Sequence, residues 1–243
     1  MKSLQTILAS VVVLRLVWLV LITYLCAELF FLNGTTPLSH KAYLVVVAAV
    51  TIIAGNMAYP YNSFTSLKPA VGFALWSLLL ACSAGLTLLV HSATLSSQTP
   101  TYLALALAVF SLSFLLCCVR HLCTTISCKS PPIPATLTLL AILTTLPFWL
   151  APVINLATMN QGLIDLILLA NPMVYLAVMV DFDILRSDWF YEHTPYGAIQ
   201  YHYPSKLSLT VYYAFSSLIL FIIAQLGTRQ RRHKRDSITS SLT

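Results

Sequence analysis

The chain has 243 residues, of which 58% are hydrophobic and 8% are charged, with a formal net charge of +6 and a mean hydropathy of +0.85. An average soluble domain contains about 25% charged residues, so this composition excludes an ordinary soluble protein. It indicates a membrane protein.

Seven apolar runs follow one another along the chain. A helix of roughly 18 residues crosses a hydrocarbon layer about 30 Å thick, and the runs lack the alternation of a barrel strand. Because lipid cannot satisfy backbone hydrogen bonds, each run is expected to be helical. We therefore predict an all-α polytopic membrane protein, a bundle of about seven transmembrane helices. The runs cover residues 7–31, 43–59, 70–90, 102–119, 135–156, 163–180 and 207–226.

Several features within the runs refine this prediction. Arg15 interrupts the first run, which argues for a retained helix rather than a cleaved signal peptide. Ala81 and Gly85, four residues apart, indicate a close helix contact in the third run. Pro147 and Pro152 lie inside the fifth run and predict a kink or break there.

The short connections predict one helical bundle over residues 1–228, followed by a basic cytosolic tail over residues 229–243. Five positive charges in residues 229–235 are expected to hold the tail near anionic lipid in the cytosol. Two topologies remain open. Seven crossings place the Asn33 sequon in the cytosol, whereas a last run that dips in and returns places Asn33, a glycosylation candidate, in the lumen.

Four of the six cysteines lie close together in residues 117–128. A zinc site would use Cys117 or Cys118, His121, Cys123 and Cys128, but their spacing matches no standard zinc pattern. We therefore predict no metal. Reduced thiols, with acylation at Cys117, Cys118 and Cys123, are the simpler interpretation.

Catalytic motifs are absent from the sequence, although polar residues occur within and beside the runs. A membrane hydrolase built from His91, His193, His202 and Asp183 would have residue types but no spacing in its favour. We therefore predict a protein that is not an enzyme and needs no cofactor. A basic tail attached directly to a membrane helix does not predict nucleic-acid binding.

Three carboxylates flank the sixth run: Asp165 near its start, and Asp181 and Asp183 just past its end. Ionisable groups at such positions either mark helix ends at the headgroups or face a bundle interior and a cation path. In a continuous helix, Asp181 and Asp183 would point about 200° apart, so only one could face inward. Asp165 would lie about 27 Å away from them, at the opposite mouth.

The order of these features resembles a known family. A Tyr-Pro-Tyr-Asn turn follows the second run at residues 59–62, Phe182-Asp183 closes the sixth run, and residues 211–221 form a tyrosine-rich last run before basic residues. This pattern is similar to the transmembrane BAX inhibitor motif family, in particular the divergent seven-span members encoded by cytomegaloviruses. The family's second aspartate, in the last span, is missing here, where Ala214 or Ser216 stands.

The resemblance implies that Asp183 faces the bundle interior and that Asp181 lies toward the headgroups, solvated or paired with Arg186. It also implies a calcium-permeable leak channel or viroporin of the host endoplasmic reticulum or another internal membrane, dampening apoptosis. Without the second aspartate, a gate of two paired carboxylates does not transfer to this chain. The alternative is a viral immune-evasion adaptor that changes the turnover of host membrane glycoproteins. Expected partners are membrane lipid, calcium and those glycoproteins.

Overall fold

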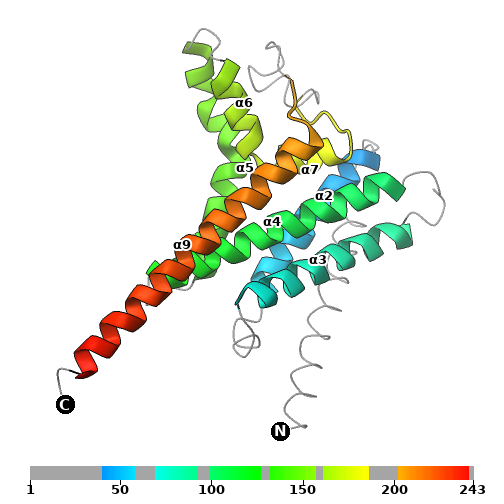
Figure 1. The fold of residues 1–243 in the computed structure, drawn as a ribbon. Helices are drawn as coiled ribbons and strands as arrows, with labels where there is room; N and C mark the ends of the chain where they lie inside the picture. Colours follow the sequence, from blue (N-terminus) through cyan, green and yellow to red (C-terminus); the bar gives the residue numbers. More distant parts are fainter. Residues whose placement is uncertain are drawn as a thin grey trace.

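The computed structural model describes residues 40–58, 69–91, 99–126, 132–156, 161–185 and 202–240, and within them the chain is helical with no strand (Figure 1). The first predicted run and Asn33 lie outside the described residues. The described helices are α2 (His40–Ala58), α3 (Pro69–His91), α4 (Thr99–Ile126), α5 (Pro132–Leu156), α6 (Gln161–Ala170), α7 (Pro172–Met179) and α9 (Lys206–Ser240).

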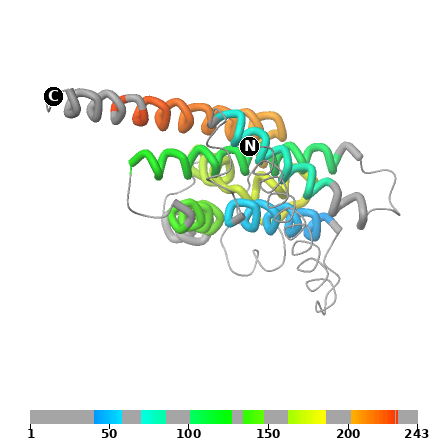
Figure 2. Tube along the Cα trace, turned by 90° about the horizontal axis from the view of Figure 1, so that it is seen from below, coloured from blue at the N-terminus to red at the C-terminus, as the bar shows by residue number. Residues whose placement is uncertain are grey.

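Helix α4 is the centre of the molecule. It packs against α2, α3, α5, α7 and α9, and in Figure 2 it lies between α9 on one side and α2 on the other. The largest side chains of the core are fully buried around it: Trp76, Tyr43, Tyr175 and Tyr213. These large rings supply extensive van der Waals contact among the helices.

The sixth run is broken, so the prediction of one continuous span there is wrong. Helices α6 and α7 meet at an angle of 81°. Asn171, which is 2% exposed, caps α7 by accepting hydrogen bonds from the backbone nitrogens of Met173 at 2.8 Å and Val174 at 3.1 Å. Pro172 follows in the first turn, where its missing N–H costs nothing. Asn171 and Pro172 therefore start a new helix inside the apolar run.

Two other predicted interruptions of helices do not occur. Helix α5 is continuous across Pro147 and Pro152, so the expected break is absent. Helix α9 runs without interruption from Lys206 to Ser240, so the alternative in which the last run dips in and returns is also wrong. The basic tail, predicted only as a tail, continues α9 through Ser240.

Helices α2, α4 and α9 run in the same direction. His121 and Thr125 of α4 lie beside Phe221 and Gly227 of α9, with ring centroids of His121 and Phe221 6.5 Å apart. The start of α2 approaches the start of α9 through Lys41, whereas its end reaches α4 through a hydrogen bond from Arg120 to the Asn56 carbonyl. We call the end near Lys41 the acidic end and the end near Arg120 the basic end.

Length and composition allow two of the described helices to cross a membrane, Thr101–Ile126 and Lys206–Thr228, with a third span if α6 and α7 count as one. The segments Lys41–Met57, Ala70–Gly85 and Pro134–Leu146 are apolar but shorter. These helices indicate an all-α protein associated with a membrane.

Candidate functional site

The C-terminal end of α7 is a tight backbone turn that positions the two neighbouring carboxylates. The Phe182 N–H donates to the Ala177 carbonyl at 2.9 Å, and the Asp181 N–H donates to the Val178 carbonyl at 3.2 Å. Asp181 has a φ of 55°, the left-handed conformation that most often belongs to glycine at this position. The helix therefore stops before Asp181, and helical spacing does not relate Asp181 to Asp183.

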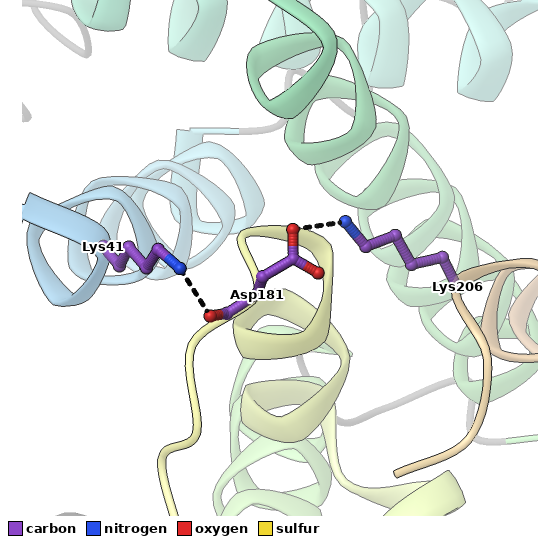
Figure 3. A network of polar contacts seen from close by, with 3 residues as sticks. All are labelled: Lys41, Asp181 and Lys206. Atoms are coloured by element: carbon purple, nitrogen blue, oxygen red, sulfur yellow. Dashed lines mark hydrogen bonds and ion pairs between the residues drawn. The ribbon is translucent and has the colours of Figure 1, made fainter. Parts of the chain in front are cut away.

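Two lysines from distant parts of the chain hold Asp181 in place (Figure 3). Lys206, at the start of α9, forms an ion pair with the Asp181 carboxylate at 2.9 Å, and Lys41, in α2, donates to its backbone carbonyl oxygen at 2.8 Å. The carboxylate itself is exposed. Arg186, the partner considered from sequence, lies outside the described residues.

Asp183 is half-buried and faces the segment that leads into α9. It accepts a hydrogen bond of 2.6 Å from the Tyr203 hydroxyl, which in turn accepts from the Leu185 N–H at 3.2 Å. A short hydrogen bond to an ionised acceptor is among the stronger ones. Asp183 is thus the more enclosed of the two carboxylates, and Tyr203 is the residue that orients it.

Asp165 does not lie at an opposite mouth. The earlier expectation assumed one straight helix, but the 81° bend at Asn171 redirects the chain. Asp165 lines a cavity of about 780 Å³ together with His202, Pro204 and Ser208. In the same segment, Tyr203 donates a hydrogen bond to Asp183 and Lys206 forms an ion pair with Asp181. Residues 202–208 therefore lie beside all three predicted carboxylates.

The predicted acylation of Cys117 and Cys118 is wrong for the described structure, because both side chains are buried in the core beside α3. Cys123 is half-buried, and Cys82 of α3, which the sequence did not single out, is exposed. Cys128 lies outside the described residues. Among the residues that the structure describes, no group of three or more His, Cys, Asp or Glu is placed to hold a metal ion.

A buried polar cluster joins α4, α7 and α9, and sequence reasoning missed it. The Tyr175 hydroxyl is hydrogen bonded to Ser111 at 2.9 Å and donates to Thr210 at 3.2 Å. Its ring stacks on Tyr213, with centroids 4.6 Å apart. Tyrosines in an otherwise apolar run were the available signal, because a buried hydroxyl needs a partner.

In comparisons with protein-family models, with curated proteins and with solved structures, nothing matches this chain. Carboxylates, a phenol and two ammonium groups gather where a broken helix meets the start of α9. Carboxylates at such an end can attract cations.

Proposed function

We propose that the chain is a multi-pass protein of an internal membrane, such as the host endoplasmic reticulum, that lets cations leak across it, as BAX-inhibitor-like proteins are thought to do. Calcium is the ion that the family resemblance favours. The observation that carries the proposal is the gathering of Asp165, Asp181 and Asp183 around residues 202–208, beside the broken helix pair α6–α7.

The direction of the helices supports six crossings, with α6–α7 re-entering from the acidic end. Helix α4 ends, as α9 does, at the basic end, and α9 begins at the acidic end. One net crossing must therefore lie between them. The unbroken α5 is better suited to it than α6–α7, which bends by 81°. Together with a first span over residues 7–31, this arrangement puts both termini on the basic side.

Charge supports the same arrangement. On this proposal nine of the thirteen Lys and Arg residues lie at the basic end, counting the tail, and three lie at the acidic end. Six of the seven acidic residues, all except Asp236, lie at or near the acidic end. Positively charged ends stay in the cytosol, so the acidic end would face the lumen. Seven full crossings would distribute the positive charges almost evenly.

A re-entrant, broken helix is a reason to propose conduction rather than a purely structural role. Interrupted helices at membrane depth occur where the backbone is buried in protein or lines an ion path. Carboxylates at the mouth of such a path raise the local concentration of cations. On the proposed topology, lumenal calcium would meet this mouth first.

The test is calcium flux from vesicles containing purified protein at matched amounts. Asp183→Asn should reduce the flux by removing the enclosed charge. Lys206→Gln should increase it, because the Asp181 carboxylate loses its ion-pair partner, whereas Lys206→Arg should leave it unchanged. The effect should shrink as salt rises, since exposed charges are screened within about 8 Å at physiological ionic strength.

Flux that is equal in the wild type, Asp183→Asn and Lys206→Gln would contradict an acidic mouth. Unchanged lumenal calcium in cells with and without the protein would contradict the leak itself. The Lys206 pair controls for folding, because Arg preserves the charge and the reach of the side chain.

The adaptor for host membrane glycoproteins is the second candidate, and the exposed face of α9 favours it. Beyond its contact with α4, α9 presents large apolar side chains outward, including Phe215, which is 62% exposed. Its helix then extends through the basic tail to Ser240. Large apolar side chains suit contact with lipid, and a continuous apolar helix face can also bind a partner's transmembrane helix through van der Waals packing. Asp183→Asn should leave glycoprotein turnover unchanged while reducing a leak.

A further inference from the structure

A second cavity, lined by none of the three carboxylates, lies between α2, α4, α5 and α7 and has a volume of about 330 Å³. Its wall is almost entirely apolar. An engineered protein cavity of roughly 150 Å³ with an apolar lining is large enough to bind benzene. This cavity therefore has room for a longer apolar group.

The polar atoms of the wall are already occupied. The Thr144 hydroxyl donates to the Leu140 carbonyl at 2.6 Å, and the Thr145 hydroxyl donates to the Ala141 carbonyl at 2.7 Å. Asn171, which adjoins the wall, donates to the Thr144 carbonyl at 3.0 Å. The hydroxyl protons are therefore already used, so a polar ligand or water would find almost no partner there, and a cavity with so few polar partners does not hold water.

The cavity opens sideways and lies at the middle of the proposed membrane. Ile53, on its wall, is 41% exposed, and Ala141 is exposed beside it. Ala49 and Ile53 follow Lys41 by eight and twelve residues, which places them about 12 to 18 Å from the acidic end at 1.5 Å per residue. That depth is near the centre of a hydrocarbon layer roughly 30 Å thick.

We infer that this cavity binds one acyl chain of a membrane phospholipid, which enters between α2 and α5 and contacts the start of α7. The acyl chain is the apolar species present at this depth, and the exposed rim joins the cavity to the lipid-facing surface. The wall includes Pro172 and Met173, so the occupant would support the helix break that shapes α6–α7. The inference rests on the membrane placement and is independent of ion flux.

Met173 offers a direct test, because it lines the cavity. Protein in which photo-methionine replaces methionine is reconstituted in palmitoyl-oleoyl phosphatidylcholine vesicles and irradiated, and adducts are located by mass spectrometry. A phospholipid adduct is expected at Met173. Met57, which is 59% exposed, should also take up lipid, whereas Met179, which is 1% exposed in the core, should not.

Two pairs of α5 variants distinguish the cavity from general lipid contact. Ala141→Phe and Thr145→Phe place a ring in the cavity and should abolish the Met173 adduct. Ala135→Phe and Thr138→Phe, at exposed positions of α5 outside the cavity wall, should preserve it. The Met57 adduct should persist in all four and serves as the check that each variant is folded in the bilayer.

Three results would overturn the inference. They are no lipid adduct at Met173 in the wild type, an adduct that both filling variants retain, or a crosslink from Met173 to a peptide of residues 1–39. The last result would mean that the chain's own first segment fills the cavity. Calcium flux is not a readout of this experiment, so a failed leak proposal would leave its outcome unaffected.

Discussion

Asp181 combines two opposing contributions to stability at one position. The left-handed backbone costs a residue with a side chain about 1 to 2 kcal/mol, while an ion pair with partners as exposed as Asp181 and Lys206 contributes roughly 0.2 to 1 kcal/mol. Asp and Asn tolerate this conformation better than other residues with side chains. Glycine would fit this backbone conformation better, but aspartate supplies the carboxylate that pairs with Lys206.

Variants at Asp181 separate these contributions. Asp181→Gly loses the ion pair but relieves the backbone, so its thermal unfolding midpoint in detergent should stay close to that of the wild type. Asp181→Val loses the ion pair and adds a β-branched side chain at positive φ, so it should be destabilised by about 1 to 3 kcal/mol. If Asp181→Val unfolds at the same temperature as Asp181→Gly, the left-handed turn is not what limits this position.

The sequence identified the three carboxylates but not their partners. Helical spacing from Asp181 pointed to Arg186, because the apolar run gave no sign that the helix ends at Met179. Lys206 and Tyr203 come after a long connection, and only the folded chain brings them to α7. Contacts between residues 20 or more positions apart cannot be deduced from local periodicity.

At the scale of helices, the apolar runs after the first coincide with described helices, although only two or three of these are long and apolar enough to cross a membrane. Run length failed at the sixth run, although Asn171-Pro172 is a recognisable helix start. The four-residue spacing of small residues also pointed to the wrong glycine as the place of a close helix contact. A side chain on Gly85 would meet nothing within 4 Å, whereas a Cβ on Gly55 would clash with a Leu80 methyl carbon.

Gly55 and Gly85 therefore form a matched pair of tests for the α2–α3 contact. Gly55→Ala should destabilise the protein by about 1 to 3 kcal/mol through overpacking against Leu80. Gly85→Ala should be neutral or stabilising by up to about 1 kcal/mol, because alanine favours a helix. Both are measured as unfolding midpoints in the same detergent.

The Trp76 indole reports on the same contact, since its N–H donates to the Gly55 carbonyl at 3.3 Å. Its fluorescence should change in Gly55→Ala and not in Gly85→Ala. Equal stability of the two variants would mean that α2 and α3 pack less closely than described.

At the scale of the whole molecule, charge and helix direction give one consistent picture. If α4 and α9 both cross the membrane, as we propose, their parallel directions need one net crossing between them, and we assign it to the continuous α5. Sequence alone could not choose between the two topologies, because the number of crossings decides which loops share a side. The positive charges looked balanced only as long as α6–α7 was counted as a span.

The proposed topology predicts which loops can be glycosylated in microsomes. Six crossings with a cytosolic tail place residues 92–98 in the lumen and residues 59–68 in the cytosol. Seven crossings with the same tail reverse both. A spaced acceptor sequon inserted into residues 92–98 should therefore be modified, and one inserted into residues 59–68 should not.

Asn33 should also be lumenal, so a glycan lost in Asn33→Gln would support the six crossings, although a sequon close to a membrane is easily skipped. The tail supplies the orienting control, because a tag after residue 243 should be digested in sealed microsomes. An accessible tail with glycan on the 59–68 insertion would contradict the six crossings. It would put the start of α2 and the start of α9 on opposite sides of the membrane, against the contacts of Lys41 and Lys206 with Asp181, and the re-entrant α6–α7 proposed to line the cation path would be lost with them.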